Sequence, residues 1–210
     1  MPVIAVVGNK GGAGKTTLCV NLAAGLARQA RKASIAVVDA DPQGSSLQWR
    51  EIADVRDTVS VFPGSENLQA QAREFAGEFD YVVVDCPPSV LAPQTVSALE
   101  VGDLALIPVQ PSPVDLWATV HIERAIANAR TINRSLRSLL VINQLEMRTT
   151  LSRVVREALK EISLPVAKTA LRRRAVYRNS ALEGKTVFEM GARGAAAAEE
   201  LEQLIQEVTT

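Results

Sequence analysis

The residues at positions 8–17 read Gly-Asn-Lys-Gly-Gly-Ala-Gly-Lys-Thr-Thr, which combines small residues with two lysines and two hydroxyls. Gly11, Gly12 and Gly14 let the backbone approach a ligand closely and adopt positive φ. Several backbone N–H groups, including that of Ala13, can then converge on one anion. The composition of this segment therefore predicts a loop that binds phosphate.

The side chains that follow the glycines suit the phosphates of a nucleotide. We expect Lys15 to reach the β- and γ-phosphates and the hydroxyl of Thr16 to hold Mg²⁺. Thr17 either caps the following helix or contacts the α-phosphate. An apolar, β-branched run at residues 3–7 predicts a buried strand before the loop, and residues 16–29 have helical spacing. The positive end of that helix points at the same anion.

Carboxylates end two further apolar segments. Residues 34–38 read as a strand and run into Asp39 and Asp41, while residues 81–85 read as a strand that ends on Asp85 itself. The carboxyl ends of strands are where open parallel sheets bind ligands. We favour a metal or nucleotide role for these carboxylates, with helix capping as the alternative for the first two.

Strands and helices alternate along the whole chain, which predicts an α/β fold with a doubly wound, mostly parallel sheet and helices on both faces. The expected strands are residues 3–7, 34–38, 59–62, 81–85, 103–108 and 139–142, with 163–168 at an edge. The expected helices are residues 16–29, 46–53, 66–76, a long one ending near 133, 147–161 and 194–210. The acidic last helix should pack back on the sheet.

The composition is that of an ordinary globular protein. At 210 residues, with 47% hydrophobic and 22% charged residues, the chain fits one domain over residues 1–210. It has no apolar stretch of membrane-spanning length and no signal peptide, so we expect a cytoplasmic protein. Cys19 and Cys86 show no metal or redox spacing, and we expect both to be inert. His121 is the single histidine and has no cysteine beside it, so we expect no metal site there.

The chain has 23 basic and 23 acidic residues, so any surface for nucleic acid must be a local patch. Basic residues gather after position 168, and such a cluster either binds the phosphates of DNA or forms a solvated helix face. We favour DNA. The candidate DNA-binding residues are Arg172, Arg173, Arg174, Arg178 and Lys185.

The glycine-rich segment departs from the strict pattern G-x-x-x-x-G-K-[ST], because Asn9 stands where the first glycine belongs. It matches instead the variant Lys-Gly-Gly-x-Gly-Lys-Thr-Thr, in which Lys10 is a second lysine. With Asp-x-Asp-Pro-Gln at positions 39–43, the chain resembles the ParA/MinD group of P-loop ATPases. The resemblance covers the chain and implies that Lys10 crosses a dimer interface to the partner's nucleotide.

The resemblance also implies roles for residues outside the loop. Asp39 supports the Mg²⁺ shell, Asp41 helps to place the attacking water, and Gln43 lies beside the nucleotide. Asp85 corresponds to the Walker B aspartate, which binds a water of the Mg²⁺ shell. Asn143, at the end of a later strand, is the candidate contact to the adenine ring.

The function implied by the resemblance is a Mg²⁺-dependent ATPase that forms a homodimer with ATP sandwiched between the subunits. It binds nucleoid DNA without sequence preference and segregates a plasmid or chromosome with a small adaptor protein that binds the cargo. The alternative is an ATPase that positions carboxysomes, of the McdA type. A MinD-like membrane regulator is less favoured, because the last helix carries glutamates where a membrane helix carries lysines. Ligases related to dethiobiotin synthetase are disfavoured by the Asp-Pro-Gln motif, and iron–sulfur transfer proteins by the cysteine positions.

Overall fold

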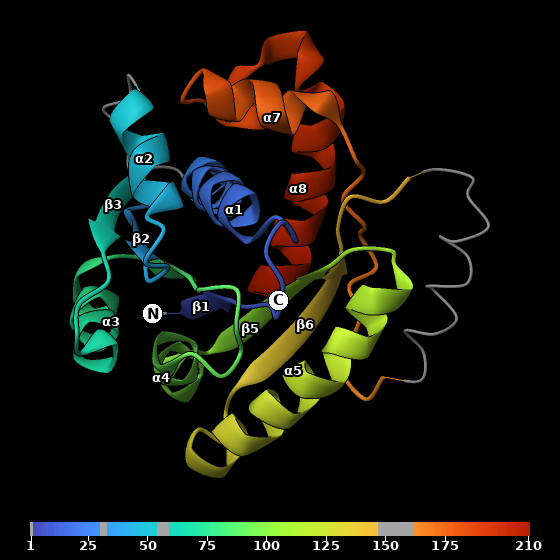
Figure 1. Cartoon of the computed structure of the whole chain (residues 1–210). Coiled ribbons are helices and arrows are strands. Elements are labelled where there is room, and N and C mark those ends of the chain that lie inside the picture. The colour runs from blue at the N-terminus through green and yellow to red at the C-terminus, as the bar shows by residue number, and fades with distance from the viewer. Residues whose placement is uncertain (1, 30–32, 54–58, 147–161) are drawn as a thin grey trace.

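In the computed structural model, residues 2–29, 33–53, 59–146 and 162–210 are described, with the backbone alone at 113–118. Six strands form one sheet in the order β3-β2-β4-β1-β5-β6, and every pair is parallel (Figure 1). The strands are β1 (Val3–Val6), β2 (Ile35–Asp39), β3 (Val59–Pro63), β4 (Tyr81–Asp85), β5 (Leu104–Val109) and β6 (Arg137–Ile142). The expected α/β fold with a parallel sheet is confirmed.

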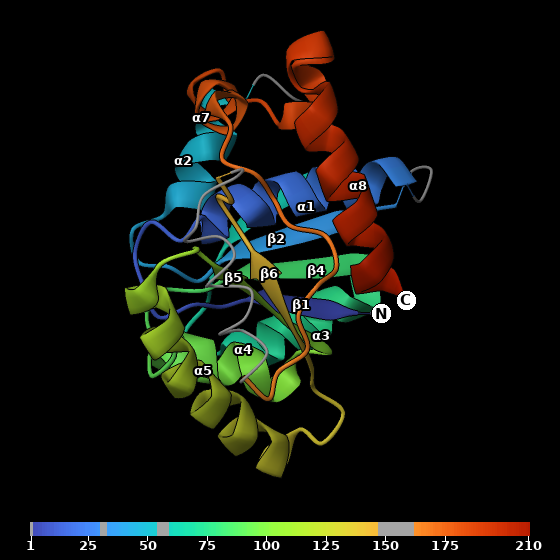
Figure 2. The same cartoon turned by 90° about the vertical axis from the view of Figure 1, so that its right-hand side faces the viewer.

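Helices cover both faces of the sheet, because the central strands are apolar on both sides (Figure 2). The helices are α1 (Lys15–Gln29), α2 (Ser45–Ile52), α3 (Leu68–Glu78), α4 (Pro93–Val101), α5 (Pro113–Ile132), α7 (Ala175–Leu182) and α8 (Ala195–Thr209). Within β1, Ala5 packs with α3, α4 and α5, whereas Ile4 and Val6 pack with α1, α7 and α8. Two short 3₁₀ turns, η1 (Val187–Glu189) and η2 (Gly191–Arg193), join α7 to α8.

The strand order brings the polar residues of the sequence to one edge of the sheet. All strands run in the same direction, so their carboxyl ends meet there. Val6, at the end of β1, is in register with Asp85 of β4, and Asp85 is in register with Asp39 of β2. The glycine-rich loop and the two carboxylates thus begin from three neighbouring strands.

The acidic last helix packs back on the molecule as expected. Leu201, Leu204 and Ile205 of α8 are fully buried in the layer that contains α1. Glu199 and Glu202 lie on its exposed side. Within the described segments, no helix is both long enough and apolar enough to cross a membrane.

The structure differs from the expected elements at residues 163–168 and at two helices, α4 and α7, for which the sequence predicted no bounds. Residues 163–168 do not form a strand, because Pro165 has no N–H to donate; only Val166 makes an isolated bridge, to Leu140. Helix α4 was not predicted, although Pro93 at its first position is a typical helix start. The expected helix at residues 147–161 lies outside the described part of the chain.

The contact between α1 and α8 depends on a glycine. A Cβ at Gly25 would overlap Ile205 Cδ1 and lie about 3.0 Å from the ring of Phe188. We expect Gly25→Ala to lower the free energy of unfolding by about 1–3 kcal/mol, because the two side chains must shift in a packed core. Urea denaturation measures the change.

Gly77, in α3, is the matched control. It is exposed, and a Cβ there would meet no atom within 4 Å. Gly77→Ala should raise the free energy of unfolding by about 0.5–1 kcal/mol through helix propensity. Equal effects of the two substitutions would show that the close α1–α8 contact does not stabilise the fold.

Candidate active site

The glycine-rich loop has the backbone conformation that its composition predicts. Gly12 and Gly14 have φ of 79° and 88°, a region in which residues with a side chain are strained. Lys15 is the first residue of α1 and only 7% exposed. Its Nζ lies 3.4 Å from the carbonyl oxygen of Lys10, so the ammonium points back into the loop. Lys10 itself is exposed at the rim.

Three side chains from the ends of β5 and β6 hold the loop. Gln110 and Gln144 both donate hydrogen bonds from Nε2 to the carbonyl oxygen of Gly12, at 2.6 and 3.1 Å. Asn143 donates from Nδ2 to the carbonyl oxygen of Ala13, at 2.8 Å. With these carbonyls turned back into the protein, the N–H groups of the loop remain available for a ligand.

Gln110 and Gln144 were not identified from the sequence. Each lies one or two residues beyond an apolar strand, which is the only sequence signal that marks them. Gln144 also has φ of 56°, the only positive φ at a non-glycine residue in the described chain. This strained backbone turns its amide toward the loop.

Asn143, the predicted adenine contact, is buried under the loop. Its Nδ2 bonds Ala13, and its Oδ1 accepts from the backbone N–H of Gln144 at 2.9 Å. A Cβ at Gly14 would lie 2.5 Å from Asn143 Nδ2, so the glycine permits this close contact. Both hydrogen bonds position the loop, and the side chain also lines the wall of the neighbouring pocket.

The two buried carboxylates lie side by side, as the register of β2 and β4 requires. Asp85 is fully buried and Asp39 is 4% exposed. Asp85 Oδ2 accepts a hydrogen bond of 2.8 Å from Ser46 Oγ, and the hydroxyl of Thr16 also donates to this carboxylate. Asp39 Oδ2 accepts from the backbone N–H of Leu47 at 3.0 Å. Ser46 was not identified from the sequence.

Burial makes ionisation of these acids costly. Loss of water raises the pKa of Asp85 to about 6, although hydrogen bonds from Thr16 and Ser46 and the charge of Lys15 oppose this shift. Burial also raises the pKa of Asp39, against the backbone N–H groups that it accepts from. The two groups thus form a site that favours a positive charge nearby.

In the segment between β2 and α2, the structure shows a capping role for one of the two carboxylates. Gly44, at the N-cap position of α2, has no side chain that could accept a hydrogen bond. The carboxylate of Asp39 takes over this role, because it accepts from the backbone N–H of Leu47 in the first turn of α2. Asp41 accepts a hydrogen bond of 3.0 Å from the backbone N–H of Gln43 and is partly exposed, whereas Gln43 is exposed. Asp41 is therefore partly accessible beside the site.

The residues present fit a Mg²⁺ ion that is bound mainly by phosphate and water. Asp85 Oδ1 is buried and has no hydrogen-bond partner, so it can accept from a metal-bound water. Thr16 would hold the ion through its hydroxyl, and Asp39 and Asp85 would hold its water shell. The described chain has no cluster of three or more His, Cys, Asp or Glu side chains able to hold a metal alone.

Most of the predicted DNA-binding residues are paired with carboxylates. Glu200 of α8 bonds both Arg174, at 2.6 Å, and Arg172, at 3.3 Å. Glu146 bonds Arg173 at 2.6 Å. Lys185 Nζ lies 2.9 Å from Glu183, and its carbonyl accepts from the indole of Trp49 in α2. Arg178 is exposed on α7.

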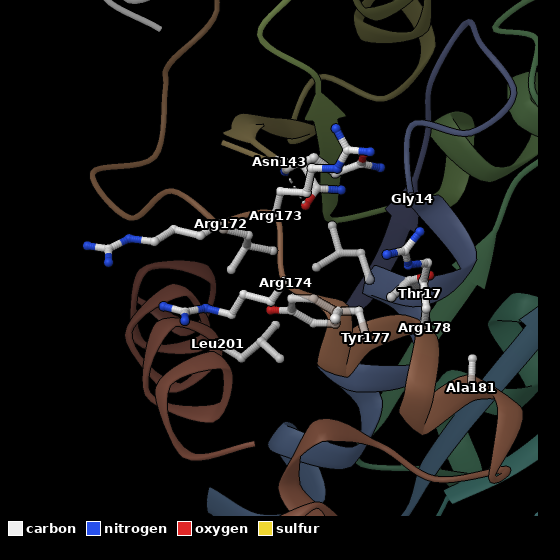
Figure 3. A pocket seen from close by; sticks show the side chains of 14 residues that line it. Gly14, Thr17, Asn143, Arg172, Arg173, Arg174, Tyr177, Arg178, Ala181 and Leu201 are labelled. Carbon is white, nitrogen blue, oxygen red and sulfur yellow. Dashed lines mark hydrogen bonds between the residues drawn. The ribbon is translucent and has the colours of Figure 1, made fainter. Parts of the chain in front are cut away.

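The same arginines border a pocket beside the glycine-rich loop (Figure 3). Gly14 and Thr17 form one wall, Asn143 lies at its top, and Tyr177 and Arg178 of α7 face them. The volume is about 360 Å³, enough for part of a nucleotide. Its position next to the end of the loop makes it the candidate site for the base and ribose.

Neither cysteine has the features of a nucleophile. Cys19 and Cys86 are fully buried. Burial, together with the nearby charge of Asp85, raises the pKa of both thiols. They pack in the core, as expected, and His121 is exposed.

The cost of burying Asp85 predicts an effect on stability. Its folded pKa of about 6 lies above the unfolded value, so the fold loses stability as the pH rises from about 4, and the loss is complete above about pH 6. We expect Asp85→Asn to raise the free energy of unfolding of the nucleotide-free, Mg²⁺-free protein by about 1–3 kcal/mol at pH 7.5. The gain should shrink as the pH falls toward 4, where the wild-type carboxyl is protonated.

Asp39→Asn is the control, measured by the same urea denaturation. Asp39 accepts backbone hydrogen bonds from Asp41 and Leu47, which offset part of the cost of its burial, so its replacement should stabilise the protein less than Asp85→Asn does. A pH-independent difference between wild type and Asp85→Asn would contradict the assigned cost of the buried charge.

Comparison with known proteins identifies the family. The model of the CobQ/CobB/MinD/ParA nucleotide binding domain matches residues 4–187. The chain is 41% identical over 209 residues to "Maintenance of carboxysome distribution protein A" of Halothiobacillus neapolitanus, covering 98% of this chain and 95% of that protein. It is 28% identical to the sporulation initiation inhibitor protein Soj of Bacillus subtilis, covering 92% of this chain and 93% of the relative.

Solved structures share the fold. Apo McdA of Cyanothece superposes with a TM-score of 0.83 at 16% identity, over the whole of both chains. MinD of Pyrococcus horikoshii, solved with Mg-ADP, superposes with a TM-score of 0.76 at 20% identity, over 99% of this chain and 97% of that one. With the glycine-rich loop and carboxylates described above, these matches show that the chain belongs to the CobQ/CobB/MinD/ParA family of nucleotide-binding domains and is an ATPase of its ParA/MinD group.

Proposed function

We propose that this protein is a Mg²⁺-dependent ATPase that positions carboxysomes, acting as one domain over residues 1–210. The observation that carries this proposal is the 41% identity to the carboxysome distribution protein of Halothiobacillus neapolitanus over nearly the full length of both chains. A second carboxysome distribution protein A, from Gloeobacter kilaueensis, is 30% identical and covers 94% of this chain. These relatives favour the carboxysome alternative over plasmid partition.

The site geometry supports ATP hydrolysis assisted by Mg²⁺. The ion neutralises charge that develops on the phosphates. The N–H groups of residues 11–14 and the ammonium of Lys15 bind the phosphates, and Thr16, Asp39 and Asp85 position the metal. Asp41, which is partly exposed, orients the attacking water.

The exposed lysine at the rim supports a dimer. Lys10 precedes the glycines and is exposed on the open side of the loop. From there it can bind the nucleotide of a second subunit, so that ATP joins two copies of the chain. We propose that this dimer binds nucleoid DNA without sequence preference and meets its cargo through a small adaptor protein.

A second candidate function is segregation of a plasmid or chromosome. It is favoured by the matches to chromosome-partitioning proteins, such as Soj of Thermus thermophilus, which is 29% identical and covers 75% of this chain. The nucleotide site would work in the same way in both functions. They differ in the cargo and in the adaptor that recognises it.

The role of Lys10 predicts a separation between binding and dimerisation. We expect Lys10→Ala to bind ATP within about threefold of wild type but to remain monomeric with ATP, because the lysine acts on the partner's phosphates. Lys15→Ala is the control and should lose ATP binding, by about 3 kcal/mol or more, since its charge is buried at the phosphates. Equilibrium nucleotide binding and sedimentation measure the two properties. ATP-dependent dimers of Lys10→Ala with normal turnover would refute the role.

The choice between cargoes predicts a cellular phenotype. In the organism that encodes this protein, deletion of its gene should cluster the carboxysomes while resident plasmids are retained. Fluorescent labelling of a shell protein and a plasmid-loss assay measure the two outcomes. Plasmid loss with evenly spaced carboxysomes would support the partition function instead.

A further inference from the structure

Carboxylates offset part of the positive charge of the arginines that cluster late in the sequence. Between residues 163 and 210 there are seven basic and six acidic side chains, and Glu200, Glu146 and Glu183 pair with five of the basic ones. Residues 119–142, which form most of α5 and β6, contain four arginines and one glutamate. This helix–strand unit is therefore a second region with an excess of positive charge.

Three of these arginines surround one hollow. Arg130 ends α5, Arg134 lies in the following turn and Arg137 begins β6. The hollow has a volume of about 480 Å³ and is also lined by the hydroxyl residues Ser135 and Ser138. Among the described residues, no carboxylate forms an ion pair with any of the three arginines.

Arg130 is held in place within the hollow. Its Nε donates to the carbonyl oxygen of Leu136 at 3.0 Å, and one terminal nitrogen donates to Ser138 Oγ at 3.0 Å. Arg134 and Arg137 are exposed. The hollow is thus lined by one guanidinium that hydrogen bonds hold in place and by two exposed guanidiniums that can adapt to a ligand.

One carboxylate does line the hollow. Glu207 of α8 lies in its wall, but both of its oxygens accept backbone hydrogen bonds, from Lys168 and Thr169, at 2.8 Å each. Its charge is therefore shared with these N–H groups and is not paired with a guanidinium. The net charge around the hollow remains positive.

The hollow lies far from the nucleotide site. The junction of α5 and β6 is at the bottom of the molecule in both views, whereas α7 and the start of α1 lie above the sheet (Figures 1 and 2). Arg137 begins a strand whose opposite end leads to Asn143 under the loop. A ligand here would not compete with ATP.

We propose that Arg130, Arg134 and Arg137 form a binding surface for the phosphodiester backbone of a nucleic acid. This inference rests on the proposed binding of DNA and assigns it to a surface other than Arg172–Arg174. Guanidinium groups match phosphate oxygens through paired N–H donors. The donors are exposed and spread over a turn, which suits a line of repeated charges; a site for one small anion has convergent, buried donors.

The experiment compares three double variants in the presence of ATP and Mg²⁺. Fluorescence anisotropy with a duplex of arbitrary sequence gives the affinity at several salt concentrations. For Arg134→Gln with Arg137→Gln, we expect about tenfold or greater loss of affinity at 0.1 M salt. The slope of log affinity against log salt should become shallower by about 0.9 for each phosphate that the variant no longer neutralises.

Arg134→Lys with Arg137→Lys keeps the charge and should keep the slope. Lys185→Gln with Arg193→Gln removes two cations that Glu183 already pairs with, and its slope should stay near that of wild type. Arg73→Gln, an exposed arginine of α3 on the far edge of the sheet, is the single-site control. Thermal melting verifies that each variant is folded.

An unchanged slope in the Arg134/Arg137 glutamine variant, with DNA binding intact, would overturn this inference and leave the proposed function standing. Failure of the wild-type protein to bind DNA at all would instead refute the DNA-binding part of the proposed function. If the variant keeps the DNA slope but no longer responds to an acidic adaptor, the surface is a protein site and the inference is wrong.

Discussion

Two carboxylates are buried side by side at the carboxyl edge of the sheet. Much of the site depends on the hydrogen bonds that offset the cost of burying these groups. Asp39 and Asp85 are neighbours because β2 and β4 are paired in register. The fold compensates by supplying donors: Ser46 and Thr16 to Asp85, and the N-terminus of α2 to Asp39. The start of α2 and the start of α1 are thus both tied to the same pair of charges.

The arginines of the chain divide into two kinds, which their sequence context does not distinguish. Arg172 and Arg174 both form ion pairs with Glu200 of α8. These ion pairs attach the segment before α7 to the last helix. The arginines near the end of α5 have no such partner among the described residues. A cluster of like charges in a sequence therefore does not indicate how much unpaired charge the folded surface carries or where that charge lies. Carboxylates from distant parts of the chain can pair with the clustered residues.

The sequence predicted the parts of the fold that follow from local pattern. The buried strands were predictable because β-branched runs such as Val82 to Val84 favour a strand that is buried on both faces. The loop was predictable because its positive φ values favour glycine. The support of the loop was not predictable. Gln110 and Gln144 come from strands about a hundred residues further along the chain, and no local pattern indicates which carbonyl a side-chain amide will meet.

The hydrogen bonds beneath the loop have a consequence for the energetics of binding. Gln110, Asn143 and Gln144 fix the backbone at Gly12 and Ala13 through carbonyl groups alone. The conformational entropy of the loop is therefore given up during folding, and little remains to be given up when phosphate arrives. Differences in affinity among variants of these amides would then reflect the disorder that they restore to the free protein.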